Sequence, residues 1–152
     1  MILIIGSSGY IGKHLFKYFS EKQEVIGTYF NNKVDGMIQF NLENPDISQL
    51  GNLENVKYAI ICSSLCNIDE CKRDEEKAYK INVNGTKKLI EQLFEKNIIP
   101  IFLSTNYVYD GEKGDYIEED ERNPQTNYGK HKKIIEDFLI ESGKEFLIFR
   151  LN

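Results

Sequence analysis

Tyr128 and Lys132 are the residues whose types and spacing point most directly to chemistry. In a helix, side chains four positions apart lie one turn apart on the same face. A lysine cation beside a phenol favours the phenolate and lowers the tyrosine pKa from about 10. A tyrosine tuned in this way acts as a general acid or base near neutral pH. The two residues therefore form a candidate proton-transfer pair.

The Tyr-x-x-x-Lys spacing is not specific by itself, because it occurs four times: Tyr18/Lys22, Tyr29/Lys33, Tyr109/Lys113 and Tyr128/Lys132. The first pair lies on the first predicted helix, the second in a predicted strand, and the third in a loop flanked by glycines. Only Tyr128 begins a helix that follows the fifth predicted strand. Ser104 and Thr105 end that strand, where a hydroxyl can hold the same substrate oxygen. Position therefore selects Tyr128, with Tyr109 as the reserve proton donor.

A glycine-rich turn, Gly6-Ser7-Ser8-Gly9-Tyr10-Ile11-Gly12, joins an apolar run to a helical pattern. Gly6 permits the tight turn, Gly9 lets the backbone approach a pyrophosphate, and Gly12 lets the helix lie close to the strand. Free N–H groups and the helix dipole then attract the anion. The turn predicts a dinucleotide-binding site, and a plain tight turn is the alternative.

The end of the second predicted strand bears on which dinucleotide is bound. An NAD site carries an Asp or Glu there, which binds the ribose 2′-OH, but the run Val25–Lys33 contains no acid. A 2′-phosphate would therefore meet no repulsion, and Asn31, Asn32 and Lys33 can donate to it. We expect NADP(H) to be favoured over NAD(H). For Lys33 alone, a solvated loop charge is the alternative.

Short apolar runs alternate with helical patterns along the chain. Strands are predicted at Ile2–Ile5, Glu24–Tyr29, Met37–Phe40, Lys57–Cys62, Ile98–Leu103 and Phe146–Arg150, helices at Tyr10–Lys22, Asp74–Lys96 (with a bend near Asn82–Gly85) and Asn127–Ser142, and a polar loop at Ser104–Thr126. Alternation predicts a parallel sheet with right-handed crossovers. The expected fold class is α/β: a doubly wound, Rossmann-type sheet of six strands in the order 3-2-1-4-5-6, in three α/β/α layers, with ligands at the carboxyl ends of the strands.

Composition and charge narrow the class of protein. A length of 152 residues suits one domain, and a formal net charge of -5 argues against binding nucleic acid or an anionic membrane surface. No apolar run approaches the ~20 residues that span a bilayer. The run Ile2–Ile5 is too short for the apolar region of a signal peptide and has no basic segment before it, so we expect a cytoplasmic protein. Cys62, Cys66 and Cys71 match no zinc spacing; we expect reduced, buried or half-buried thiols and no metal. His14 and His131 are expected to be solvated.

As a set, these motifs resemble the extended short-chain dehydrogenase/reductase family, and within it the dTDP-4-dehydrorhamnose reductases. The residues that carry the resemblance are Gly6-x-x-Gly9-x-x-Gly12, Cys62-Ser63-Ser64, Asn82-Val83-Asn84-Gly85-Thr86, Ser104-Thr105-Asn106-Tyr107-Val108-Tyr109-Asp110-Gly111 and Tyr128-Gly129-Lys130-His131-Lys132. The resemblance implies that Thr105, Tyr128 and Lys132 are catalytic. It also places Asn41 and Leu42 near the adenine. The expected cofactor-binding residues are Gly6, Ser8, Gly9, Tyr10, Ile11, Gly12, Tyr29, Asn31, Lys33, Asn41, Leu42, Cys62, Ser63, Ser64, Tyr128 and Lys132.

The resemblance implies an NAD(P)H-dependent reductase of a nucleotide-linked 4-keto-6-deoxy sugar. Tyr128 would donate the proton to the new hydroxyl, Lys132 would lower the tyrosine pKa and hold the nicotinamide ribose, and Thr105 would position the keto oxygen. A nucleotide-sugar epimerase and a non-catalytic dinucleotide-binding regulatory relative are the alternatives. Sugar dehydration is disfavoured, because Asn106-Tyr107 stands where dehydratases of the family carry Asp-Glu.

Some positions depart from the pattern of these reductases. Asn41 and Asn106 stand where Asp is common, and Tyr109 where Phe is common. Members also carry a nucleotide-sugar-binding part after the sixth strand. We therefore expect residues 1–152 to be the dinucleotide-binding domain of a longer reductase, with a naturally short binding module as the alternative. Such a chain should bind cofactor and turn over sugar poorly alone. A nucleotide sugar is the expected partner, and a homodimer is left open.

Overall fold

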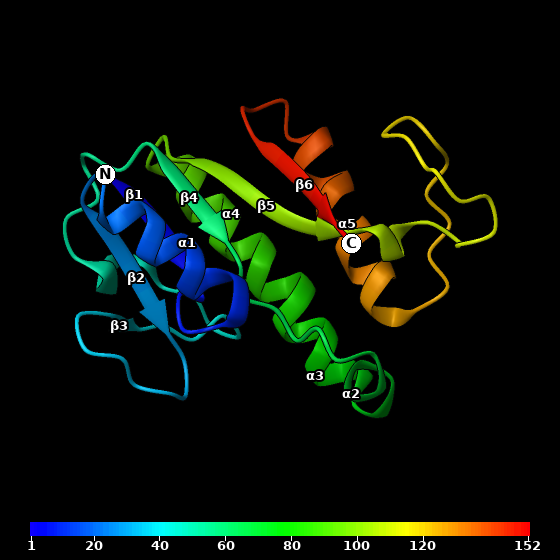
Figure 1. Ribbon diagram of the computed structural model, residues 1–152, viewed down its shortest axis with the longest axis horizontal. Helices are drawn as coiled ribbons and strands as arrows, with labels where there is room; N and C mark the ends of the chain where they lie inside the picture. Colours follow the sequence, from blue (N-terminus) through cyan, green and yellow to red (C-terminus); the bar gives the residue numbers. More distant parts are fainter.

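Six parallel strands form one sheet in the order β3-β2-β1-β4-β5-β6 in the computed structural model, which describes residues 1–152 (Figure 1). The strands are β1 Ile2–Ile5, β2 Val25–Tyr29, β3 Ile38–Gln39, β4 Tyr58–Ile61, β5 Ile99–Thr105 and β6 Leu147–Leu151. The predicted doubly wound α/β fold and its strand order are confirmed. Because all strands run in the same direction, their carboxyl ends lie along one edge of the sheet (Figure 1).

Helices and short helical turns connect the strands. They are α1 Tyr10–Ser20, η1 Ile47–Leu50, α2 Ile68–Arg73, α3 Glu75–Tyr79, η2 Lys80–Gly85, α4 Thr86–Glu95, η3 Asn106–Val108 and α5 Asn127–Glu141. The single helix expected at Asp74–Lys96 is interrupted by η2, a wide π turn at the position of the expected bend. Sequence reasoning missed α2, although Asn67 caps it by accepting from the Glu70 N–H at 2.9 Å.

The core lies on both faces of the sheet. On one face, α4 and α5 bury Leu89, Leu93 and Leu139 against Leu3 and Ile61, within a cluster of 17 buried apolar residues. On the other face, α1 packs its half-buried apolar side chains against Ile2, Ile4 and Ile60. All four residues of β1 are buried, as its continuous apolar run predicts for a strand covered on both faces.

The polar segment after β5 is anchored to the core by a buried carboxylate. Glu136 on α5 is 0% exposed and pairs with Arg150 at 2.8 Å and Arg122 at 3.0 Å. The hydroxyl of Ser104 donates to the same carboxylate at 2.5 Å. Burial acts to raise the pKa of Glu136, but these donors outweigh it and lower the pKa. Arg150 also contacts the Tyr109 hydroxyl, so the segment seen in yellow in Figure 1 is tied to β6 and α5.

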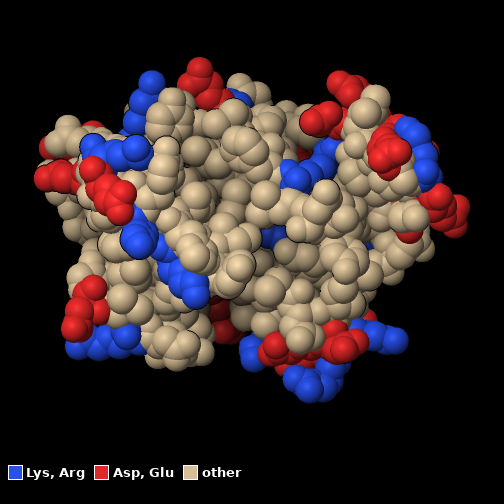
Figure 2. All heavy atoms as spheres, in the orientation of Figure 1, with Lys and Arg blue, Asp and Glu red and all other residues tan.

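Apolar side chains are exposed along the edge strand β6. On β6, the side chains of Leu147, Phe149 and Leu151 are exposed, while Ile148 packs against the core on the face that α5 covers. Acidic and basic side chains are interspersed over the face drawn in Figure 2. None of the helices combines the length and apolar character that a membrane span requires. All three cysteines are free thiols, and Cys66 is exposed, so the expectation of a buried or half-buried thiol is wrong for Cys66.

Candidate active site

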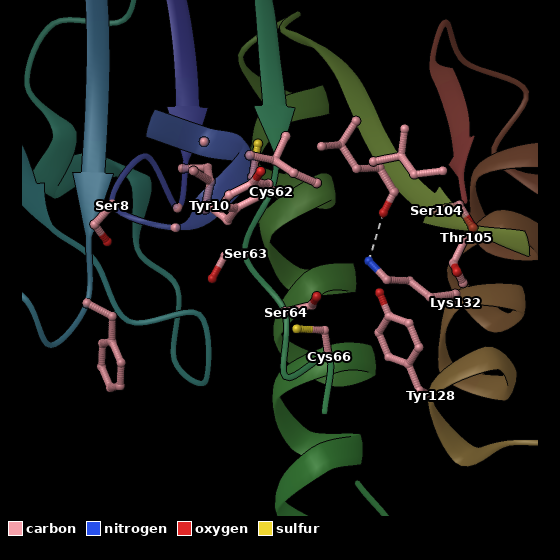
Figure 3. A pocket seen from close by; sticks show the side chains of 18 of the residues that line it. Ser8, Tyr10, Cys62, Ser63, Ser64, Cys66, Ser104, Thr105, Tyr128 and Lys132 are labelled. Carbon is pink, nitrogen blue, oxygen red and sulfur yellow. Dashed lines mark hydrogen bonds between the residues drawn. The ribbon is translucent and has the colours of Figure 1, made fainter. Parts of the chain in front are cut away.

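A cleft of about 500 Å³ opens at the carboxyl ends of β1, β4 and β5. One side is the glycine turn, and the other is formed by the end of β5 and the start of α5, which contribute Thr105, Tyr128 and Lys132. The segment that carries Ser63, Ser64 and Cys66 runs between the two sides (Figure 3). The structure thus brings the predicted glycine turn and the predicted proton-transfer group into one cavity.

The glycine turn has the close approaches that its sequence requires. Gly6 has a φ of +88°, a conformation that L side chains rarely adopt. A Cβ on Gly12 would lie 2.1 Å from the Gly6 carbonyl oxygen, so only glycine lets α1 start this close to β1. The first helical N–H groups, those of Tyr10, Ile11 and Gly12, have no hydrogen-bond acceptor within the chain. These free donors at a helix N-terminus fit the pyrophosphate of a dinucleotide.

Two hydroxyls that sequence reasoning missed hold the turn against β2. The Gly6 N–H donates to Thr28 Oγ1 at 2.8 Å. The Thr28 N–H donates to Ser7 Oγ at 3.2 Å, and Ser7 Oγ donates to the Ile4 carbonyl at 2.9 Å. The signal was available, because side chains alternate along a strand. Thr28 and Phe30 line the cleft, whereas Tyr29 between them does not.

A second cavity of about 400 Å³ adjoins the cleft and shares Phe30, Ser63 and Ser64 with it. Asn31, Asn41 and Leu42, which the sequence associated with the adenine end of the cofactor, line this cavity. Lys33 is exposed and lines neither cavity, and neither does Tyr29. The aromatic ring of Phe30, which bridges both spaces, was not predicted.

Lys132 is buried at the floor of the cleft. Its Nζ donates to the Leu103 carbonyl oxygen at 2.8 Å, the bond dashed in Figure 3. Burial lowers the pKa of Lys132 to about 8, while Cys66, Cys62 and Glu136 act weakly in the opposite direction. The Lys132 amine therefore begins to lose its proton just above neutral pH, whereas an exposed lysine, with a pKa of about 10.4, stays charged there.

Tyr128 lies one turn before Lys132, with its side chain in the cleft beside Ser64 (Figure 3). Thr126 caps the helix by accepting from the Gly129 N–H at 3.0 Å, which fixes where α5 begins. Burial raises the pKa of Tyr128, and the Ser64 hydroxyl opposes this rise. The expected lowering of the tyrosine pKa by Lys132 is therefore wrong for this structure. The ammonium bonds Leu103 and lies 5.6 Å from the centre of the Tyr128 ring.

The two hydroxyls at the end of β5 are used differently. Ser104 donates to Glu136, on the α5 side of the sheet. Thr105 Oγ1 accepts from the Tyr107 N–H at 3.3 Å and contacts Asn106 Oδ1 at 3.4 Å, both long contacts. Thr105 is thus the hydroxyl that remains available to a ligand in the cleft.

Two expectations about neighbouring residues are wrong. The Tyr109 hydroxyl donates to the Ile117 carbonyl at 2.7 Å, and its ring stacks on Tyr116 outside the cleft. It is therefore no reserve proton donor. His131 is 6% exposed rather than solvated, because α3 and η2 pack over it. His14 is exposed, as expected.

Comparison with known proteins shows the family of the chain. Residues 1–152 match the family model described as the RmlD substrate binding domain. The chain belongs to this family, which lies within the extended short-chain dehydrogenase/reductase superfamily.

Three relatives illustrate the relationship. A dTDP-4-dehydrorhamnose reductase from Aggregatibacter actinomycetemcomitans is 28% identical over 98% of this chain and 50% of its own length. Methionine adenosyltransferase 2 subunit beta from Danio rerio is 28% identical over 86% of this chain and 41% of its own length. The crystal structure of a hypothetical dTDP-4-dehydrorhamnose reductase from Sulfolobus tokodaii superposes with a TM-score of 0.86, at 33% identity, over 98% of this chain and 54% of that one. The chain therefore spans about half the length of these relatives.

Proposed function

We propose that this chain is the dinucleotide-binding part of a reductase that acts on a nucleotide-linked 4-keto-6-deoxy sugar. The observation that carries the proposal is the convergence of Thr105, Tyr128 and Lys132 on the side of one cleft that faces the glycine turn. A relative that covers nearly the whole chain is named dTDP-4-dehydrorhamnose reductase, which supports this choice of substrate class.

The cleft fits a nicotinamide dinucleotide, which supplies a hydride when it is bound in reduced form. The free N–H groups of Tyr10, Ile11 and Gly12 would hold its pyrophosphate. Asn31, Asn41 and Leu42 line the adjoining cavity, where the adenosine end would lie. Two carboxylates line this cavity together with Lys77: Glu43, which is paired with Lys80 at 2.5 Å, and Glu70. The end of β2, where an NAD site carries an Asp or Glu, has no acid in the run Val25–Lys33, so we favour NADP(H) over NAD(H).

The chain's own residues would handle the proton. Because its pKa is raised, Tyr128 is protonated at neutral pH, which is the form that donates to a developing alkoxide. Lys132 places a positive charge beneath the site and is held there by the Leu103 carbonyl. Thr105 would orient the keto oxygen toward the phenol.

A second candidate function is dinucleotide binding without catalysis. It is favoured by the match to methionine adenosyltransferase 2 subunit beta, a protein named as a subunit. An epimerase remains the alternative among enzymes. Net oxidation of the cofactor identifies a reductase, because an epimerase returns the hydride and a pure binding subunit transfers none. An epimerised sugar product then separates the epimerase from the binding subunit.

The test is a steady-state assay of the longer reductase that we expect to contain this chain, with NADPH and a dTDP-4-keto-6-deoxy sugar, which follows nicotinamide absorbance and the sugar product. We expect reduction at C4 that falls by roughly 10²–10⁴-fold in Tyr128→Phe. Tyr18→Phe, on the exposed surface of α1, is the matched control and should keep full activity. Equal rates for Tyr128→Phe and wild type would refute the role of the phenol. Stoichiometric cofactor binding without any turnover would favour the binding function.

A further inference from the structure

Asn82 binds the backbone of the segment that lines the cleft between its two sides. Its side chain is 4% exposed and lies on the π turn η2. Asn82 Oδ1 accepts from the Leu65 N–H at 2.8 Å, and Asn82 Nδ2 donates to the Leu65 carbonyl at 2.8 Å. One amide thus binds both backbone groups of a residue outside the helices. Leu65 is flanked by Ser64 and Cys66, which line the cleft beside Tyr128 (Figure 3).

The two Leu65 bonds fix the orientation of the amide. A backbone N–H needs an acceptor and a carbonyl needs a donor, so the oxygen and nitrogen of Asn82 cannot exchange places without losing both bonds. The second N–H of Asn82 Nδ2 then faces His131 Nδ1 at 3.5 Å and the Cys71 thiol at 3.9 Å. His131 Nδ1 can accept this N–H only in the neutral ring that carries its proton on Nε2.

A protonated His131 is incompatible with this arrangement. Both ring nitrogens of a histidinium are donors, so Nδ1–H would face the Asn82 amide N–H inside a buried contact. Turning the amide to present its oxygen to His131 breaks both Leu65 bonds. Either response weakens the hold of Asn82 on Leu65.

The surroundings of His131 are mixed in charge. Burial lowers its pKa, and Glu75 opposes this effect. The Tyr79 ring meets the imidazole edge-on at 5.5 Å between centroids. The carboxylate of Glu75 is occupied by Asn127 Nδ2 at 2.7 Å. His131 also lines a surface cavity together with Glu76, Lys80 and Asn84. On the side of His131 that faces Asn82 lies the buried Cys71 thiol.

We propose that Asn82 and His131 are positioning residues for the cofactor cleft, and that protonation of His131 releases the Leu65 segment. Neutral His131 lets Asn82 hold Leu65, and so keeps Ser63, Ser64 and Cys66 in place along the cleft. When acidification protonates His131, the Leu65 segment is released from Asn82 and dinucleotide binding weakens. The cofactor consequence rests on the proposed function, whereas the coupling of His131 to Leu65 does not.

The experiment is NMR on the chain, whose mass is 17.7 kDa. Imidazole ¹⁵N shifts give the tautomer and titration of His131, and amide exchange gives the protection factor of Leu65 at each pH. We expect the Nε2–H tautomer at neutral pH and a drop of about tenfold or more in Leu65 protection as His131 becomes charged, the size of a lost buried hydrogen bond. The amide of Ile4 in the core reports global unfolding and should not follow this titration.

Variants distinguish the coupling between His131 and Leu65 from a nonspecific effect of low pH. His131→Asn places an amide oxygen near the position of Nδ1 without a titrating group, and it should abolish the pH dependence. His14→Asn, at an exposed histidine, should retain it. NAD⁺ is the cofactor probe, because a 2′-phosphate titrates itself near pH 6. We expect its affinity to fall about tenfold over the same range in wild type and to stay level in His131→Asn.

The outcomes distinguish the two proposals. An Nδ1–H tautomer, or Leu65 protection that stays constant through the His131 titration, overturns the coupling. NAD⁺ binding that ignores the titration while Leu65 responds overturns the link to the cleft. If neither NAD⁺ nor NADP⁺ binds any variant at any pH while Leu65 responds, the coupling stands and the proposed cofactor site fails.

Discussion

Replacing Lys132 with methionine should change how the stability of the chain depends on pH. The Lys132 side chain is buried, with a single hydrogen bond to the Leu103 carbonyl. Burial lowers its pKa from 10.5 to about 8. Since one pKa unit corresponds to about 1.4 kcal/mol, the charged form destabilises the folded chain by about 3 kcal/mol relative to the neutral form. Methionine has a similar length and carries no charge.

The direction in which stability changes with pH follows from proton linkage. The folded pKa lies below the unfolded value, so the unfolded chain binds more protons between about pH 8 and pH 10.5. The free energy of unfolding of the wild type should therefore rise with pH through this window. Between about pH 7 and pH 9 the gain is roughly 1 kcal/mol, and Lys132→Met should lack it.

Urea unfolding of both proteins at several pH values measures this difference. Lys130→Met, on the exposed side of the same helix, is the matched control. The wild type should gain stability relative to Lys132→Met as the pH rises, and it should show no such gain relative to Lys130→Met. A difference between wild type and Lys132→Met that stays constant from pH 7 to pH 9 would refute the claim that the Lys132 amine is desolvated.

Three further substitutions test other parts of the structure. Gly12→Val should abolish dinucleotide binding, because its Cβ would lie 2.1 Å from the Gly6 carbonyl oxygen; calorimetry with unchanged affinity would contradict this. Glu136→Gln should lower the free energy of unfolding by roughly 3 kcal/mol at neutral pH by leaving two arginines uncompensated. The deficit should shrink as acid protonates Glu136 in the wild type, and a urea series at falling pH checks it. Phe149→Ser should shift stability by less than about 1 kcal/mol, because the ring is 51% exposed; a larger loss in the same assay would show that the ring is packed.

The fold was predictable because local patterns and global topology agree. The apolar run at Ile2–Ile5 is buried on both faces, and alternation of strands with helices leaves a parallel sheet as the natural arrangement. The glycine turn was predictable for the same reason: Gly6 and Gly12 are required by contacts close in sequence. Tyr128 and Lys132 followed from helical spacing and from their place after β5.

The features that were not predicted depend on contacts between residues distant in sequence. The π turn η2 brings Asn82 to Leu65 and lets Gly85 lie against the Leu42 carbonyl, and neither partner is evident from a local pattern. The raised pKa of Tyr128 depends on how deeply the assembled cleft buries the phenol. His131 was taken as solvated because the packing of α3 against α5 has no local signature.

The most direct test of the account is a calorimetric titration of the chain with NADPH and with NADH. We expect one dinucleotide per chain, tighter binding of NADPH, and loss of both in Gly12→Val. Tighter binding of NADH would reverse the cofactor preference and leave the site in place. Absence of binding by either dinucleotide would contradict the central claim that the cleft between the glycine turn and Tyr128 is a cofactor site.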